Sequence, residues 1–309
     1  MRRCRSRSSA SSGCRERDGV ALMTLRRLTL IAALLCAALG AHAQSVARRD
    51  IEIPMTVKGF FGESHIKLAA TEYRPEGNGP FPVLVINHGT PRSSADIPKM
   101  QDRYARQAEM FAKHGFLVLN PLRRGYGKSD GPWAENYFSC ANPDYVQAGL
   151  ESAKDISAAL DYARTLPYAD AQHMVLLGKS AGGFGVLALS SLNPEGVVGT
   201  INFAGGRGSR GPDDVCNEAK LVDAFGRYAS TTRVPMLWVY SENDHFFGPA
   251  LASRLLEAYK AKGVDVRFER VPPYGNDGHA FFEGRDNAAI WVPMVDQFLA
   301  KLGLPRHPQ

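Results

Sequence analysis

Short apolar runs alternate with longer amphipathic segments along this chain, and the alternation restricts the possible fold more than any other feature. The nearly continuous apolar runs are residues 83–86, 116–119, 174–177, 198–203 and 236–240, with 264–271 a less pure sixth. Runs of this kind are typical of strands buried on both faces. Segments with helical periodicity lie at 98–114, 145–166, 181–192, 249–262 and 287–302. This order predicts an α/β fold with a mostly parallel central sheet flanked by helices.

Two segments precede this pattern and one interrupts it. Residues 51–57 alternate in polarity and 64–73 are a plausible partner, which predicts an antiparallel hairpin at the N-terminal end of the sheet. Residues 205–233 are rich in glycine and polar residues, with a short helical piece around 221–228. They form either a lid-like excursion over one end of the sheet or an ordinary loop with one crossover helix. Residues 44–309 contain no repeat or long linker and are expected to form a single domain.

Residues 23–43 have the pattern of a signal peptide. A pair of arginines precedes an apolar run that is shorter than the roughly 20 residues of a membrane span, and an A-x-A sequence follows. We expect cleavage before Gln44, a periplasmic or secreted protein, and no stable membrane anchor after cleavage. Residues 1–22, rich in Arg and Ser, are expected to be an untranslated or disordered upstream segment, with translation starting at Met23.

The formal net charge of +6 belongs to this leader. Residues 1–43 hold eight of the 37 basic residues and two of the 31 acidic ones, which leaves 29 of each from Gln44 onward. A formally neutral mature chain argues against nucleic acid or another strongly acidic surface as the main partner. The oligomeric state is not fixed by the sequence.

Two cysteines, Cys140 and Cys216, remain after removal of the leader. An even pair in an oxidising compartment predicts one disulfide. Two buried free thiols are the alternative, because sequence does not give the distance between them.

A candidate nucleophile, Ser180, lies in the G-x-S-x-G pattern Gly178-Lys179-Ser180-Ala181-Gly182. An apolar strand precedes the pattern and a helix of small residues follows it, which is the context of a nucleophile elbow. The sharp turn requires small neighbours, and the helix N-terminus supplies N–H groups for a developing oxyanion. The alternative is a turn serine that caps the helix. We expect the side chain of Lys179 to be structural or exposed, without a part in proton transfer.

A serine needs a base, and the base needs an orienting carboxylate. His279 is the candidate base, in the loop between the last apolar run and the last helix, and Asp244 is the candidate acid after the run 236–240. Loops at the carboxyl ends of parallel strands face one crevice, so Ser180, Asp244 and His279 can converge. Glu242 is the nearest competing carboxylate, whereas Asp277 is too close in sequence to His279.

Backbone N–H groups are expected to form an oxyanion hole. The segment "INHGTPRSS" (86–94) follows the first buried strand, and the N–H of Thr90 can lie beside that of Ala181. We expect a structural role for the side chain of His88.

The order Ser…Asp…His, the elbow and the His-Gly loop together resemble the α/β-hydrolase superfamily over residues 51–302. The segments "LRRGYGKSDG" (122–131) and "GHAFF" (278–282) are similar to the dienelactone-hydrolase and prolyl-oligopeptidase-like branch. Two features depart from that branch. Dienelactone hydrolases proper have a cysteine nucleophile where this chain has Ser180, and the chain has no length for the β-propeller of prolyl oligopeptidases.

The residues and the resemblance together predict an exported serine hydrolase that cleaves carboxylic esters of small molecules through an acyl-enzyme. The alternatives are an exopeptidase for short peptides, an acyltransferase, or an inactive binding protein on the same fold. An exopeptidase would need carboxylates for the amino terminus, for which Asp213 and Asp214 are candidates. No metal-binding pattern or phosphate-binding glycine loop is present in the sequence, so we expect no cofactor and no metal.

Two further groups of residues could contact a substrate. Four arginines could bind a carboxylate, but we favour solvated loop positions for them: Arg123, Arg124, Arg207 and Arg210. Four aromatic residues could line an acyl pocket or serve in packing: Tyr126, Trp133, Tyr137 and Phe138.

Overall fold

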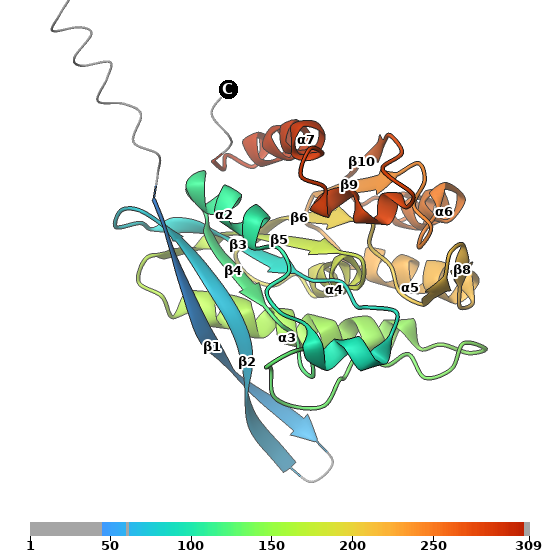
Figure 1. The fold of residues 1–309 in the computed structure, drawn as a ribbon, viewed down its shortest axis with the longest axis horizontal. Helices are drawn as coiled ribbons and strands as arrows, with labels where there is room; N and C mark the ends of the chain where they lie inside the picture. Colours follow the sequence, from blue (N-terminus) through green and yellow to red (C-terminus); the bar gives the residue numbers. More distant parts are fainter. Residues whose placement is uncertain (1–44, 60–61, 306–309) are drawn as a thin grey trace, which may run out of the picture. The chain divides into compact units, whose positions relative to one another are not determined.

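An eight-stranded sheet forms the centre of the protein in the computed structural model, which describes residues 45–59 and 62–305 (Figure 1). The predicted signal peptide and the segment before it lie outside the described residues. The strand order is β1-β2-β4-β3-β5-β6-β9-β10. The strands are β1 Val46–Gly59, β2 Gly62–Pro75, β3 Phe81–Asn87, β4 Leu117–Pro121, β5 Ala169–Lys179, β6 Val197–Phe203, β9 Met236–Ser241 and β10 Val266–Val271.

The strands of the sheet run in the predicted directions relative to one another. β1 and β2 form a long antiparallel hairpin, with Ile53 opposite Leu68, and β2 is antiparallel to β4. The pairs from β4 to β10 are all parallel. The expectation of a mostly parallel sheet opened by an N-terminal hairpin is therefore confirmed. The carboxyl ends of the parallel strands meet at one edge, where loops from several strands converge.

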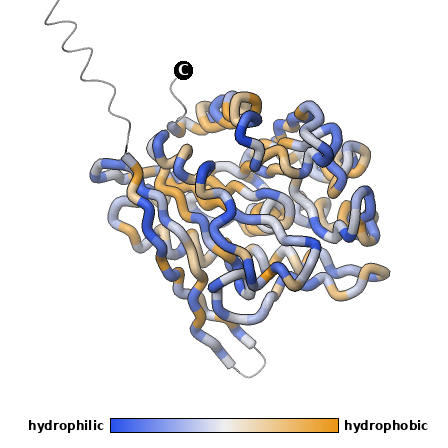
Figure 2. Tube along the Cα trace, viewed as in Figure 1, coloured by the Kyte–Doolittle hydropathy of each residue, from blue (hydrophilic) through white to orange (hydrophobic). Residues whose placement is uncertain are grey.

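Helices cover both faces of the sheet. They are α2 Ala105–Lys113, α3 Tyr145–Arg164, α4 Ala181–Ser190, α5 Glu218–Ala229, α6 Pro249–Lys260 and α7 Ala288–Lys301. Alternate strand residues face opposite layers: Val83 and Val85 pack toward α3 to α6, whereas Leu84 and Ile86 pack toward α2 and α7. Hydrophobic stretches gather along the inner strands, whereas the edge strand β1 carries many hydrophilic positions (Figure 2).

The helix predicted over 98–114 is wrong at its start. The chain forms a 3₁₀ turn, Ser94–Lys99, and α2 begins only at Ala105. The side chain of Asp102 accepts hydrogen bonds from the Tyr73 hydroxyl and from Asn120 Nδ2. These bonds attach residues 100–104 to β2 and β4 and prevent them from forming the first turn of the helix.

The segment 205–233 combines a short hairpin with a regular crossover helix. Two short strands, β7 Ser209–Gly211 and β8 Asp214–Val215, form the hairpin, and α5 then packs against α3, α4 and α6. α5 is longer than the expected helical piece around 221–228, because the side chain of Asn217 accepts from Lys220 N and caps an earlier first turn.

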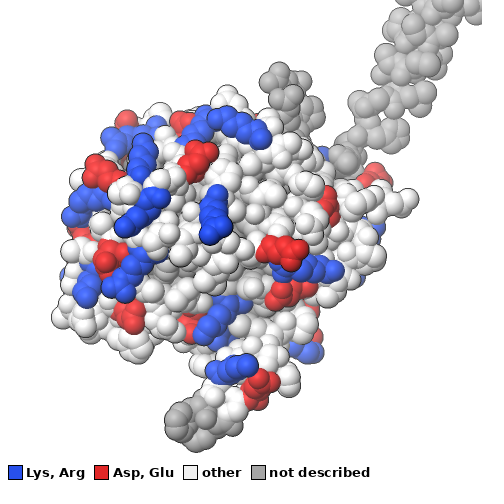
Figure 3. Space-filling model, turned by 180° about the vertical axis from the view of Figure 1, so that it is seen from behind, with Lys and Arg blue, Asp and Glu red and all other residues white. Residues whose placement is uncertain are grey.

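Charges of both signs are interspersed on the face seen in Figure 3. This distribution agrees with the formally neutral composition from Gln44 onward. Among the residues that the structure describes, no helix has the length and apolarity to cross a bilayer.

Candidate active site

Ser180 occupies a strained turn between β5 and α4. Its backbone has φ 58° and ψ −123°, a conformation that residues with a Cβ rarely adopt. The turn is held by hydrogen bonds from Ser180 N to Phe203 O (3.0 Å) and from Gly206 N to Ser180 O (3.2 Å). A Cβ at Gly182 would lie 2.2 Å from Asn87 O, and one at Gly178 would lie 2.3 Å from Gly182 O. The small residues predicted to flank the serine are therefore required by close backbone packing.

The three candidate catalytic residues form one chain of hydrogen bonds. His279 Nε2 lies 2.9 Å from Ser180 Oγ, and His279 Nδ1 lies 3.0 Å from Asp244 Oδ2. The other oxygen of Asp244 accepts from the backbone N–H groups of Phe246 (2.7 Å) and Phe247 (2.9 Å). Glu242 is exposed. Asp277 Oδ1 instead accepts from the backbone N–H of His279 at 2.9 Å.

Burial and charge keep the imidazole of His279 neutral. Burial lowers the pKa of His279 and the positive charge of Lys179 lowers it further, whereas Asp244 acts in the opposite direction. Burial alone would raise the pKa of Asp244, but the hydrogen bond and charge of His279, together with the backbone N–H groups of Phe246 and Phe247, outweigh that effect, and the pKa is lowered. A neutral histidine beside an ionised aspartate is the state in which Nε2 can accept the proton of a serine.

Two residues that the sequence did not indicate cover the imidazole. The ring of Phe246 stacks on His279 with centroids 3.8 Å apart, and the guanidinium of Arg92 lies 3.4 Å from the centroid of Phe246. Arg92 also donates to Ser209 Oγ, at 2.9 Å from Nη2, and so attaches the hairpin β7–β8 to this stack. The stack shields one face of the candidate base from water.

The predicted oxyanion donors lie beside Ser180. Thr90, Ser180 and Ala181 line the same cavity. Ala181 is the first residue of α4, so its N–H has no acceptor one turn earlier in that helix. A Cβ at Gly89 would lie 3.5 Å from Ser180 Oγ, which shows how closely the loop 88–90 approaches the serine.

The favoured expectation of solvated arginines is wrong for three of the four. Arg123, Arg124 and Arg207 are buried because each guanidinium is paired with a buried or partly buried carboxylate. Arg210 is exposed and is paired with Asp214 at 2.8 Å. Among the aromatic candidates, Trp133 and Tyr137 line the cavity at Ser180, Tyr126 is fully buried and Phe138 is 73% exposed.

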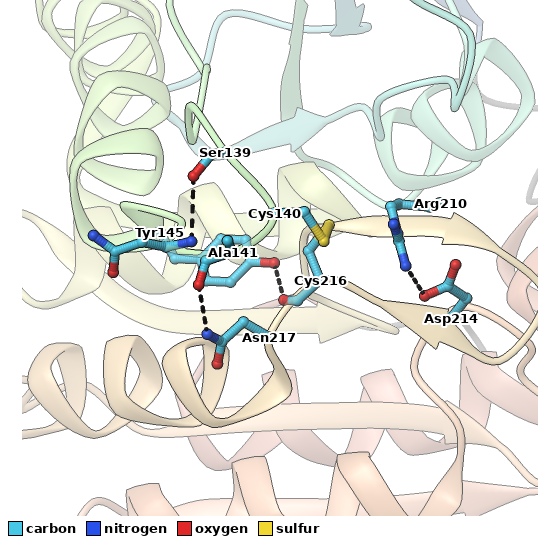
Figure 4. The surroundings of a disulfide bond; sticks show 9 residues. Ser139, Cys140, Ala141, Tyr145, Arg210, Asp214, Cys216 and Asn217 are labelled. Carbon is cyan, nitrogen blue, oxygen red and sulfur yellow. Dashed lines mark hydrogen bonds and ion pairs between the residues drawn. A yellow bond between two sulfur atoms is a disulfide. The ribbon is translucent and has the colours of Figure 1, made fainter.

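A disulfide joins Cys140 to Cys216, with Cα atoms 4.8 Å apart (Figure 4). It connects the loop before α3 to the end of the hairpin β7–β8. The hydroxyl of Tyr145 donates to the carbonyl of Cys216, and Asn217 Nδ2 donates to Ala141 O at 3.1 Å. Cys216 N also donates to Gly208 O at 2.9 Å. Since Gly208 lines the cavity at Ser180, the bridge supports one wall of that cavity.

Lys179 and the two acidic candidates for amine binding are each paired with another ionisable side chain. Lys179 is nearly buried and lies 3.2 Å from Glu283 Oε1. Asp213 pairs with His245 at 2.9 Å and Asp214 pairs with Arg210, and neither acid lines the two cavities that contain Ser180. Within residues 45–59 and 62–305, no three His, Cys, Asp or Glu side chains are grouped as metal ligands.

The model of the dienelactone hydrolase family matches residues 68–296, which is most of the chain. This chain belongs to the dienelactone hydrolase family. The resemblance identified from the sequence is thereby confirmed, and the match indicates that this family member is a hydrolase. Comparison with curated proteins finds no match.

Solved structures with the α/β-hydrolase fold are similar to this family member. A Klebsiella pneumoniae protein assigned as a dienelactone hydrolase aligns with TM-score 0.58 and 15% identity, over 84% of this chain and 99% of its own. A Pyrococcus horikoshii acylaminoacyl peptidase aligns with TM-score 0.62 and 16% identity, over 87% of this chain and 43% of its own. A Pyrococcus furiosus esterase aligns with TM-score 0.56 and 15% identity, over 82% of this chain and 91% of its own. These likenesses establish the α/β-hydrolase fold.

The electrostatics of His279 predict the pH dependence of activity. If neutral His279 is the base, kcat/KM rises with pH and reaches half of its plateau below 6.5, the ordinary pKa of histidine, because the pKa of His279 is lowered. Lys179→Met removes a nearby positive charge, which raises that pKa and moves the half-plateau to higher pH. Lys113→Met, at an exposed ion pair on α2, serves as the control and should leave the profile unchanged. Superimposable profiles for wild type and Lys179→Met would contradict the electrostatic argument.

Loss of the disulfide is expected to destabilise the protein. The bridge joins two cysteines 76 residues apart in the sequence, and a disulfide typically contributes about 2–4 kcal/mol to stability. We expect the double variant Cys140→Ala, Cys216→Ala to unfold at a correspondingly lower urea midpoint. Adding reductant should destabilise the wild type but not the double variant. Equal midpoints for the two proteins with and without reductant would contradict the expectation that the bridge stabilises the fold.

Proposed function

We propose that this protein is an exported serine esterase that hydrolyses carboxylic esters through Ser180, His279 and Asp244. The observation that carries the proposal is the uninterrupted chain from Ser180 Oγ through His279 to Asp244 Oδ2, with distances of 2.9 and 3.0 Å. The disulfide supports export, because such bridges persist mainly in oxidising compartments.

In the proposed mechanism, each of these side chains takes part in a defined step of ester hydrolysis. Ser180 Oγ attacks the ester carbonyl carbon while its proton passes to His279 Nε2, and the N–H groups of Ala181 and Thr90 stabilise the oxyanion. The bond from carbon to the alcohol oxygen then breaks, and His279 gives its proton to that oxygen. Water attacks the acyl-enzyme and gives a proton to His279, which returns it to Ser180 as the carboxylic acid leaves.

Two cavities that are both lined by Ser180 indicate where the acyl group and the alcohol of an ester bind. A compact cavity of about 110 Å³ is lined by Ala181, Trp133 and Phe247, and His279 is not among its lining residues. A larger cavity of about 590 Å³ contains His279. Since His279 must protonate the leaving oxygen, the alcohol occupies the larger cavity and the acyl group occupies the compact one. We therefore expect short acyl chains and bulkier alcohols to be preferred.

A peptidase is the second candidate, favoured by the likeness to an acylaminoacyl peptidase. The engagement of Asp213 and Asp214 away from the cavities at Ser180 favours the esterase over a peptidase that binds a free amino terminus. An acyltransferase would use the same acyl-enzyme, with an alcohol or amine in place of water.

A substrate panel distinguishes the two candidates. The purified protein is assayed on p-nitrophenyl acetate, butyrate and octanoate and on aminoacyl- and acetylaminoacyl-coumarins, with Ser180→Ala as the blank. We expect the acetate and butyrate to be hydrolysed with higher kcat/KM than the octanoate and the coumarins. Higher kcat/KM on a coumarin would make the peptidase the better proposal, and preference for the octanoate would contradict the assignment of the cavities.

A further inference from the structure

A buried network of charges lies behind the loop 88–90, outside the hydrogen-bonded chain of Ser180, His279 and Asp244. Its centre is Glu135, which is 0% exposed. One oxygen of Glu135 pairs with Arg123 Nε, and the other pairs with Arg207 Nη2 and accepts from the Tyr126 hydroxyl at 2.8 Å. The two arginines hold the pKa of Glu135 well below its usual range in spite of its burial. Glu135 is therefore a carboxylate that faces two buried guanidinium groups.

Arg123 connects this network to the backbone of the loop. Its Nη1 donates to His88 O at 2.8 Å, and its own backbone N–H donates to His88 Nε2 at 3.1 Å. A backbone N–H can only donate, so Nε2 of His88 is the unprotonated nitrogen. Burial and the charge of Arg123 lower the pKa of His88 and keep its ring neutral. The ring hydrogen is then on Nδ1, which donates to Gly89 O at 2.8 Å.

The bond to Gly89 O fixes the direction of the Thr90 N–H. The carbonyl of Gly89 and the N–H of Thr90 belong to one planar peptide, in which they point in opposite directions. His88 Nδ1 holds the carbonyl of Gly89 toward the imidazole ring. The N–H of Thr90 therefore points away from the His88 ring, and Thr90 lines the cavity that Ser180 and Ala181 also line.

The side chain of Thr90 is held by the same network. Arg207 Nη1 donates to Thr90 Oγ1 at 3.0 Å. Because the Tyr126 hydroxyl gives its only hydrogen to Glu135, Thr90 Oγ1 is the donor in its 2.6 Å bond to the Tyr126 oxygen. The hydrogen bonds therefore run in one direction, from Arg207 through Thr90 and Tyr126 to the carboxylate of Glu135. Buried hydrogen-bond networks with all members satisfied are rigid.

We propose that Glu135 is a positioning residue for the oxyanion hole, and that through Arg123, Tyr126 and Arg207 it fixes the loop His88–Thr90 so that the Thr90 N–H meets the developing oxyanion. The inference rests on the proposed esterase function. Oxyanion donors contribute mainly in the transition state, so a misdirected N–H lowers kcat and leaves KM nearly unchanged.

Three variants of the full protein test the inference by removing different groups of the network. Tyr126→Phe removes the hydroxyl between Thr90 and Glu135, Thr90→Val removes the other end of the same contact, and Glu135→Gln removes the charge. Losing one oxyanion donor costs about 10²–10³ in kcat. We expect a loss of about 10-fold for Tyr126→Phe and Thr90→Val and about 100-fold for Glu135→Gln, with KM within about 2-fold.

Phenylboronic acid provides a readout that a purely structural role would not change. It forms a tetrahedral adduct on a serine oxygen and resembles the transition state, so its Ki should rise by the same factor by which kcat falls. Tyr228→Phe is the matched control, since this buried hydroxyl donates to the carbonyls of Tyr145 (3.2 Å) and Val146 (2.9 Å) away from the loop. We expect it to lower stability without changing kcat or Ki.

The outcomes separate this inference from the proposed function. If the wild type hydrolyses esters and Ser180→Ala does not, but folded Tyr126→Phe and Thr90→Val keep kcat and Ki within 2-fold of the wild type, the network does not position the oxyanion hole. A rise in KM with constant kcat would also overturn the inference, because it would indicate ground-state binding. If the wild type and Ser180→Ala are equally inactive, the proposed function itself fails, and the inference fails with it. Should Glu135→Gln not fold, the two hydroxyl variants carry the test.

Discussion

Replacing Ser180 by alanine is expected to lower kcat/KM for p-nitrophenyl acetate by at least about 10⁴-fold. The variant loses the hydroxyl oxygen that lies 2.9 Å from His279 Nε2, and without this nucleophile no acyl-enzyme forms. Alanine is smaller than serine and keeps a Cβ in the same position, so the strained turn and the packing of Gly178 and Gly182 should persist. The assay is the initial rate of p-nitrophenol release, with far-UV circular dichroism to establish that the variant folds.

The residual rate of Ser180→Ala is itself informative. The N–H groups of Ala181 and Thr90 remain, and enzymes without their nucleophile retain some catalysis from the oxyanion hole and binding. A fall of less than 10-fold in a folded variant would mean that another residue is the nucleophile.

Asp244→Asn is expected to lower kcat by about 10⁴-fold while the fold is kept. The reason lies in the two oxygens of Asp244. Oδ1 accepts from the backbone N–H groups of Phe246 and Phe247, so an asparagine must place its oxygen there. Its NH₂ group then faces His279 Nδ1 and donates to it. The imidazole hydrogen is forced onto Nε2, which can no longer accept the proton of Ser180.

Glu242→Gln is the matched control for this substitution. Glu242 was the nearest competing carboxylate in the sequence, and its side chain is exposed. We expect kcat for Glu242→Gln within about 2-fold of the wild type, as for most surface substitutions. A large loss for Glu242→Gln together with an active Asp244→Asn would exchange the roles of the two residues.

The sheet could be predicted from sequence because burial on both faces leaves a simple signature. The runs 83–86 and 174–177 became the centres of β3 and β5, and the alternating segments 51–57 and 64–73 became β1 and β2. The start of α2 could not be predicted, because it depends on the tertiary bonds of Asp102 to Tyr73 and Asn120. Local periodicity does not contain such contacts.

Some residues of the candidate site could be predicted from the sequence and others could not. Ser180, Asp244 and His279 follow strand ends, so the topology of a parallel sheet was enough to predict that they meet. Glu135 gave no such signal. It lies in an irregular loop, and its importance arises from Arg123 and Arg207, which reach it from separate segments of the chain. The arginines were expected to be solvated because the sequence did not show where their buried counter-ion lies.

Labelling with a fluorophosphonate probe is the sharpest test of Ser180 as the nucleophile. The wild-type protein is incubated with the probe, its intact mass is measured, and the labelled peptide is sequenced by mass spectrometry. We expect one adduct per chain, located on Ser180, and no adduct on Ser180→Ala or on His279→Ala within the same time. An unlabelled wild type, or an adduct on any residue other than Ser180, would contradict the account.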